Sequence, residues 1–262
     1  MTKNLQAKYI INDTTAKLHV SNGNSKIGQG VYNFSTLPGN SEHLLKLKDG
    51  TILTNVYGTC SKHCEGCFNG GCYAVNSCRL HHNAVVPAWA ENTVLLRKGT
   101  LFDQLTKYIQ KNQSKIQLFR INVSGEIESM QEFEKWNQIC LQFPHIHFGL
   151  YTKNFEALDE FMQKHGDSAP NFCINVSQWN HVADAFLAKY PNKFNVFEYN
   201  PTNRKDCDWS LAERARLAKL PKCPAVDIHG HHTKKSDGTP LTCKDCGRCY
   251  RKTGQTTAVY AH

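Results

Sequence analysis

Strand-like and helix-like segments alternate along the middle of the chain, and this alternation restricts the fold more than any other feature. The pattern runs from Ile116 to about Tyr199. The expected strands are Ile116–Ser124, Ile146–Tyr151, Phe172–Val176 and Phe194–Tyr199, and the expected helices are Met130–Phe143, Phe155–Lys164, Val182–Lys189 and Trp209–Lys219. Alternating strands and helices favour right-handed crossovers and a parallel sheet covered by helices.

Two further strands and a long helix complete the expected fold. We expect Thr51–Tyr57 to be the first strand, Pro87–Lys111 to be helical, and a sixth strand to lie near Ala225–Ile228. The sequence thus predicts an α/β protein built as an incomplete parallel (β/α)6 barrel of the TIM type. We expect three parts, namely an N-terminal extension with a hairpin (1–50), the partial barrel with a cysteine loop (51–220), and a cysteine-rich metal-binding extension (221–262).

Composition limits the cellular setting and the partners of the chain. Its 262 residues, 40% of them hydrophobic, are enough for one sizeable core. No segment approaches the roughly 18 consecutive apolar residues of a membrane span, and the N-terminus has no secretory layout, so we expect a cytoplasmic protein without membrane contact. Lys and Arg exceed Asp and Glu by 31 to 22. This excess indicates either a nucleic-acid-binding surface or an ordinary basic protein.

Three cysteines in a short loop indicate a metal centre. Cys60, Cys64 and Cys67 have C-x3-C-x2-C spacing. Three thiolates can hold three corners of a [4Fe–4S] cluster and leave the fourth iron open, whereas electron-transfer clusters and structural zinc sites use four ligands. The alternative is that Cys72 or Cys78 supplies a fourth thiolate and closes a cluster or zinc site.

Polar residues follow the expected strands at the end where ligands usually bind. Ser124-Gly125-Glu126 ends one expected strand, and Tyr151-Thr152-Lys153 ends the next. Loops at the carboxyl ends of parallel strands converge on one face, so we expect Gly125, Glu126 and Lys153 to lie beside the cysteine loop. Lys153 suits a carboxylate or phosphate, although a solvated lysine is equally compatible with the sequence. No residue is assigned a catalytic role.

The segment from Cys60 to Phe68-Asn69 resembles the cluster loop of radical S-adenosylmethionine enzymes, and it is especially similar to the activating enzymes of anaerobic ribonucleotide reductases. The resemblance implies that the open iron binds S-adenosylmethionine and that cluster reduction cleaves it to a 5′-deoxyadenosyl radical. It also implies that Ser124-Gly125-Glu126 corresponds to the superfamily's Gly-Gly-Glu segment, which holds the methionine amino group. A reductase or flavodoxin would then supply the electron.

A second resemblance covers most of the chain. Its segments are Gly23–Gly28, Leu37-Pro38, Cys72–Ala74, Trp89–Asn92, Phe119–Glu126, Tyr151–Lys153 and the cysteine-rich end. Together they resemble the gene product 88 family of bacteriophages and mobile elements, whose function is poorly defined. The resemblance implies that one site contains Asn24, Lys26, Arg120, Glu126 and Lys153.

Four cysteines near the C-terminus indicate a second metal centre. Cys223, Cys243, Cys246 and Cys249 have C-x19-C-x2-C-x2-C spacing, which brings the last three around one point. Zinc and [4Fe–4S] clusters both accept four thiolates, and the tight triplet favours the cluster over zinc. The pattern is similar to the auxiliary-cluster extensions of many radical S-adenosylmethionine barrels. His229, His231 and His232 lie between these cysteines, either as substitute ligands or as exposed loop residues.

The sequence therefore predicts an iron–sulfur enzyme that resembles radical S-adenosylmethionine proteins, with two [4Fe–4S] clusters, and that cleaves S-adenosylmethionine to act on a substrate that the sequence does not identify. The alternative is a phage or mobile-element nucleic-acid-binding protein with structural zinc or iron–sulfur sites and no catalysis.

Overall fold

A curved seven-stranded sheet forms the centre of the molecule, and its strands follow one another in sequence order. The strands are β1 (Val20–Asn22), β2 (Val31–Phe34), β3 (Leu118–Ile121), β4 (His147–Thr152), β5 (Phe172–Gln178), β6 (Asn195–Asn200) and β7 (Thr256–Tyr260). β1 pairs antiparallel with β2, and every later neighbour pairs parallel. The prediction of an α/β protein with a mostly parallel sheet is thereby confirmed.

The computed structural model describes residues 16–24, 27–39, 58–60, 72–179, 181–201, 209–227, 229 and 231–260. Several sequence predictions lie outside these residues: the strand Thr51–Tyr57, the ligands Cys64 and Cys67, and the site residue Lys26. No helix in the described part of the chain is long and apolar enough to cross a membrane.

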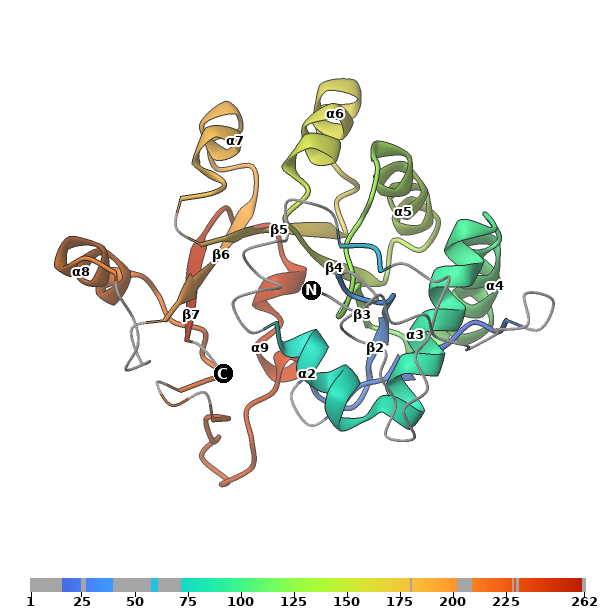
Figure 1. Cartoon of the computed structure of the whole chain (residues 1–262), viewed down its shortest axis with the longest axis horizontal. Helices are drawn as coiled ribbons and strands as arrows, with labels where there is room; N and C mark the ends of the chain where they lie inside the picture. The colour runs from blue at the N-terminus through green and yellow to red at the C-terminus, as the bar shows by residue number, and fades with distance from the viewer. Residues whose placement is uncertain are drawn as a thin grey trace, which may run out of the picture.

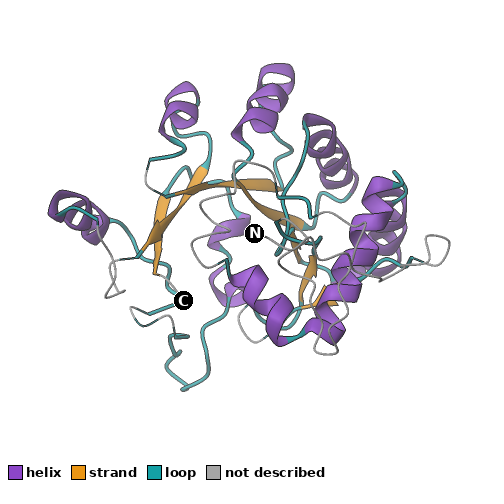
Figure 2. Ribbon diagram, in the orientation of Figure 1, coloured by secondary structure: helices purple, strands orange, loops and turns teal. Residues whose placement is uncertain are grey.

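Helices lie on both sides of the sheet. They are α2 (Tyr73–Leu80), α3 (His82–Arg97), α4 (Leu101–Asn112), η3 (Gln113–Lys115), α5 (Met130–Gln142), α6 (Phe155–His165), α7 (Asp184–Lys189), α8 (Leu211–Lys219), α9 (Cys243–Cys246) and η4 (Arg248–Tyr250). α5, α6 and α7 lie along the convex side of the sheet, and α9 lies on the concave side (Figure 1). We call these sides the outer face and the inner face. Figure 2 shows the same arrangement by type of element.

The main core lies between the outer face and its helices. Along β3, Phe119 and Ile121 belong to this core, and so do Phe133 and Trp136 of α5. Side chains alternate across a strand, so Leu118 and Arg120 of β3 point to the inner face. Leu118 packs there in a small second cluster with Ile27, Val31, Tyr250 and Cys243.

Side-chain caps explain where three of the helices begin. Ser129, Asn154 and Ser210 each accept a hydrogen bond from the backbone N–H three residues further along, at the start of α5, α6 and α8. Such caps satisfy N–H groups that the first helical turn leaves unpaired. These helices therefore begin close to the positions that the amphipathic pattern predicts.

Two sequence predictions about the elements are wrong. The expected helix Pro87–Lys111 is two helices, α3 and α4, because the chain turns at Gly99, where φ is +72°. The expected strand near Ala225–Ile228 is not formed in its described part, where Val226 makes only an isolated bridge to His232. The strand beyond β6 is β7, whose β-branched residues lie after the cysteines.

Candidate functional site

Glu126 joins three chain segments at the carboxyl end of the sheet. Its backbone N–H donates to the Thr59 hydroxyl at 2.8 Å. Its carboxylate oxygens accept from the backbone N–H groups of Ile127 at 2.9 Å and Lys153 at 2.8 Å. The residue is only 3% exposed. Glu126 thus connects the residue before Cys60 with the ends of β3 and β4.

Gly125 allows this connection because it has no side chain. Its φ is +84°, and a Cβ atom there would lie 1.9 Å from the Thr36 hydroxyl oxygen and 2.5 Å from that of Thr59. The two threonine hydroxyls are hydrogen-bonded to each other at 2.8 Å, and the Thr36 N–H donates to the Ser124 carbonyl at 3.1 Å. The ends of β2 and β3 and the start of the cysteine loop therefore meet in a contact that tolerates only glycine.

The charge of Glu126 is held in an unfavourable environment. Burial raises the pKa of its carboxyl, and the positive charge of Lys153 together with the hydrogen bonds acts in the opposite direction without cancelling the rise. The Lys153 ammonium lies 5.7 Å from the centre of the Trp179 ring. A cationic group bound here would stabilise the ionised form of Glu126.

Arg120 and Tyr151 lie next to each other on the inner face of the sheet. The guanidinium carbon of Arg120 is 3.8 Å from the centre of the Tyr151 ring, which meets Phe197 edge-on at 4.7 Å. Burial raises the pKa of the Tyr151 hydroxyl well above its usual value. The inner face therefore carries one cation stacked on an aromatic ring.

The C-terminal cysteines lie on the same face. Cys249 belongs to η4, and its backbone carbonyl accepts a hydrogen bond from the Asn175 side chain at 3.0 Å. Burial raises the pKa of the Cys249 thiol to about 11. A hydrogen bond with Tyr151 and the positive charge of Arg120 oppose this rise, whereas the nearby Cys243 and Cys223 thiols add to it. These thiols are therefore close enough to influence one another.

Metal-binding geometry is absent from the described residues. They contain no group of three or more His, Cys, Asp or Glu side chains arranged to hold a metal ion. Cys243 and Cys246 begin and end the single turn α9, which Thr242 and Asp245 cap reciprocally. A metal centre at the four C-terminal cysteines remains a prediction.

The structure brings some predicted site residues together. Gly125, Glu126 and the backbone of Lys153 meet beside Thr59, which precedes the half-buried Cys60. Asn24 lies before β2 and Glu126 lies after β3, which runs parallel to β2, so the implied grouping of these two residues stays a prediction. The Asn24 side chain accepts a hydrogen bond from the Ile27 N–H at 2.9 Å.

Cys72 and Cys78, the alternative ligands, lie at the start of α2 and within it. The Cys78 thiol is fully buried, and burial, together with the nearby Cys72, raises its pKa to about 12.

Several residues of this region were missed from the sequence. Thr36 and Thr59 connect the residue before Cys60 with the ends of β2 and β3, and Asn175 and Asn195 hold the C-terminal segment on the inner face. The signal was present, because strands of a parallel sheet usually read as continuous apolar runs. Asn175 and Asn195 interrupt such runs at inner-face positions of β5 and β6.

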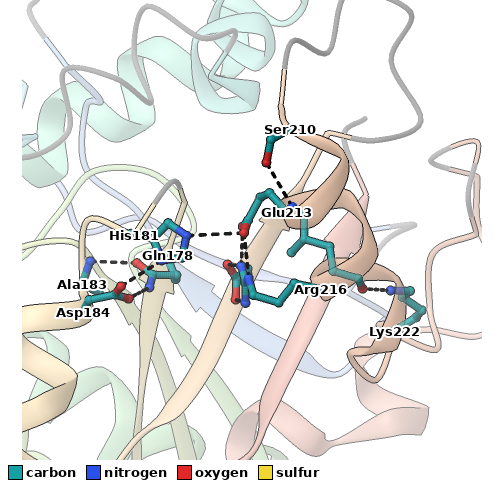
Figure 3. A network of polar contacts seen from close by, with 10 residues as sticks. Gln178, His181, Ala183, Asp184, Ser210, Glu213, Arg216 and Lys222 are labelled. Carbon is teal, nitrogen blue, oxygen red and sulfur yellow. Dashed lines mark hydrogen bonds and ion pairs between the residues drawn. The ribbon is translucent and has the colours of Figure 1, made fainter.

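A second polar network lies at the carboxyl ends of β5 and β6 (Figure 3). Glu213 of α8 accepts from Arg216 at 2.6 Å, and its carboxylate lies 3.4 Å from the His181 ring. The other His181 ring nitrogen is 2.8 Å from Asp184, which also accepts from Gln178 at 2.6 Å. The network connects the end of β5 and the start of α7 with α8.

Comparison with known proteins gives one match. A family model described as Gene product 88 matches residues 11–252. No curated protein and no solved structure matches the chain.

Proposed function

This chain belongs to the gene product 88 family, and we propose that it is an iron–sulfur enzyme that resembles radical S-adenosylmethionine proteins. Cys60, Cys64 and Cys67 would bind a [4Fe–4S] cluster that leaves one iron open for S-adenosylmethionine. The curved sheet would serve as an incomplete (β/α)6 barrel, and a reductase or flavodoxin would supply electrons. When bound, such a cluster supplies the electron for reductive cleavage of S-adenosylmethionine.

One contact carries this proposal. The two segments that resemble the superfamily, the cysteine loop and Ser124-Gly125-Glu126, are far apart in the sequence. The Glu126 N–H nevertheless donates to Thr59, the residue before Cys60. In parallel α/β sheets ligands bind at this end of the strands. A cofactor held by the loop would therefore be within reach of Glu126.

The residues around Glu126 have the chemistry to hold an amino acid group. A carboxylate has about four acceptor positions, and that of Glu126 contacts the backbone N–H groups of Ile127 and Lys153 and the side chain of Thr152. Accepting from an ammonium would offset the cost of burying its charge. Lys153 would attract the opposite, carboxylate end of the same molecule. The absence of a side chain at Gly125 keeps the loop close enough for both contacts.

The C-terminal cysteines fit a metal by their chemistry and not by their present arrangement. Four thiols suit a second [4Fe–4S] cluster or zinc. Cys223 and Cys243 raise the pKa of the Cys249 thiol, but no group of described side chains surrounds a metal position. We propose a metal here on the spacing alone and derive no chemical step from it.

The basic C-terminal segment favours a second candidate function. Lys234, Lys235, Lys244, Arg251 and Lys252 are exposed there. A nucleic-acid-binding protein with structural metal sites would use such residues to neutralise phosphates. Its binding to DNA or RNA would weaken steeply as the salt concentration rises, whereas cleavage of S-adenosylmethionine would not occur.

Anaerobic purification tests the two candidates directly. The enzyme should be brown, contain iron and sulfide, and release 5′-deoxyadenosine from S-adenosylmethionine in the presence of dithionite. Cys64→Ala should lower this release at least about tenfold, because the loop would lose a ligand. Cys140→Ala is the control, since Cys140 is buried in α5 and belongs to neither cysteine group.

Equal release by wild type and Cys64→Ala, or none by either, would overturn the enzyme proposal. A colourless protein with stoichiometric zinc and salt-sensitive binding to nucleic acid would instead support the second candidate.

A further inference from the structure

Arg120 carries a positive charge on the inner face without an acidic partner among the described residues. It shares this face with Leu118, while Phe119 and Ile121 point to the outer core. Its nearest interacting groups are the rings and hydroxyls of Tyr151, Tyr73 and Tyr250 and the thiol of Cys249. A guanidinium surrounded by neutral groups is costly to bury.

Hydrogen bonding at Arg120 is also incomplete. Its Nε atom is buried and has no acceptor among the described residues. The Tyr151 ring covers the guanidinium at 3.8 Å, and such stacking leaves the edge N–H groups free to bind an acceptor in the guanidinium plane. Arg120 as a whole is half-buried.

Tyr250 supplies a second, independent observation. This residue is only 3% exposed, and its hydroxyl is buried without a hydrogen-bond partner. Buried hydroxyls are normally paired, because an unpaired one loses its hydrogen bonds to water without replacement. Its ring passes over Gly149, where a Cβ atom would lie 2.8 Å from the ring.

Gly149 is also the residue that pairs with Arg120 across β3 and β4. The two unpaired donors, the Arg120 Nε–H and the Tyr250 O–H, therefore belong to adjacent positions on the inner face. Within the part of the chain that the structure describes, both lack an acceptor and the charge lacks a counter-ion. One anionic group would satisfy all three requirements.

We propose that Arg120 and Tyr250 form an internal anion-binding site that takes the carboxylate or phosphate group of a small molecule. Arginine and a phenol are suitable donors, since the planar guanidinium matches both anions and the hydroxyl adds a directional bond. Anion binding at this site does not depend on the iron–sulfur proposal.

The test measures thermal unfolding of the anaerobically purified full chain in inorganic phosphate or acetate, with chloride at matched ionic strength as the reference. Wild type should melt at a higher temperature in at least one of the two anions than in chloride. The anion with the larger shift identifies the ligand class. Arg120→Gln should lose the shift, and Arg79→Gln, which removes an exposed cation of α2, should retain it.

Tyr250→Phe keeps the test valid if Arg120→Gln does not fold. It should weaken the binding of the effective anion about tenfold, because a hydrogen bond to a charged group is lost. Without that anion it should melt no lower than wild type, since the variant removes an unpaired buried hydroxyl.

Three results would overturn the site: no shift of wild type beyond chloride, an undiminished shift in Arg120→Gln, or loss of bound metal in Arg120→Gln without any response to either anion. The last result would mean that the positive charge of Arg120 stabilises the C-terminal thiolates and does not bind a small anion. Metal content, measured in parallel, separates failure of this site from failure of the proposed iron–sulfur centre.

Discussion

Gly125 and Glu126 illustrate how single residues determine the carboxyl edge. Gly125 adopts a φ of +84° with two threonine hydroxyls in the space of its missing side chain. Glu126 is placed by this turn so that its N–H reaches Thr59. A change at either residue should therefore alter the contact between the cysteine loop and β3.

Gly125→Ala should destabilise the protein by about 2 kcal/mol more than Gly99→Ala, as measured by urea denaturation. Both glycines have a positive φ, but a Cβ at Gly99 meets nothing within 4 Å. The difference between the variants therefore isolates the clash with Thr36 and Thr59 from the backbone cost. Equal destabilisation would show that the loop moves aside freely.

Glu132 should make stability decline with rising pH. Burial, and then the negative charge of Glu128, raise the pKa of its carboxyl to about 8. Between the ordinary pKa of a glutamate, roughly 4.3, and about 8, the folded state holds a proton that the unfolded state has lost, so the free energy of unfolding falls as pH rises.

Urea denaturation of wild type between about pH 5 and pH 8 should show this decline, amounting to about 1–3 kcal/mol. Glu132→Gln should flatten it, and Glu160→Gln, which changes an exposed glutamate, should not. A pH dependence unchanged in Glu132→Gln would mean that other groups cause the decline.

Among the elements, α8 is held to the sheet by one ion pair more than by apolar packing. Only Leu217 of this helix is buried. Arg216 reaches β6, where it donates to both carboxylate oxygens of Glu198, a side chain that is 3% exposed. The same guanidinium also binds Glu213 on its own helix (Figure 3). The attachment of α8 to the sheet therefore depends on an ion pair in which Glu198 is buried and Arg216 is partly exposed.

Arg216→Met should lower the free energy of unfolding by about 2 kcal/mol, because it leaves Glu198 charged and buried. The exposure of Arg216 itself keeps the loss below that of a fully buried pair. Lys189→Met is the matched control, since Lys189 forms an exposed pair with Asp159 at 2.7 Å. The control should change stability by less than about 0.5 kcal/mol. Similar losses in both variants would contradict the role given to Arg216.

At the scale of the whole molecule, the C-terminal segment closes onto the inner face that the earlier strands form. Asn195 of β6 accepts from the backbone of Thr253 and Gly254 and donates to the carbonyl of Arg251. β7 then joins the sheet beside β6. The contacts that attach the cysteine segment and the last strand to the sheet thus include those of Asn195, the bond from Asn175 to the Cys249 carbonyl and one parallel pairing.

Asn195→Ala should increase hydrogen exchange in residues 243–260 more than elsewhere, because the segment loses the hydrogen bonds that Asn195 makes with its backbone. Asn171→Ala is the matched control, because it also removes a buried asparagine that hydrogen-bonds to the backbone. Asn171 donates to the carbonyls of Cys140, Phe143 and Ile146 in the core. That variant should increase exchange around α5 and leave the C-terminal segment protected. An even increase along the chain in Asn195→Ala would contradict a local attachment.

Much of the fold was predictable, because it depends on local periodicity. The four central strands and the helices between them follow from the alternation of apolar residues. Ser124-Gly125-Glu126 was expected at a strand end and lies there. The sequence pattern missed β2 as a sheet strand and treated α3 and α4 as one helix, since short strands and a single glycine turn give weak local signals.

The sequence by itself determined the α/β character, the parallel order of the central strands and the placement of Glu126 at the carboxyl ends of these strands. These features depend on residue spacing along neighbouring segments. Only the tertiary structure decided that Thr59 touches Glu126, that β7 is the last strand, and that Tyr250 packs on Gly149, the residue paired with Arg120. Those outcomes join residues distant in the chain, and the packing that joins them depends on shape and hydrogen bonding across the whole sheet.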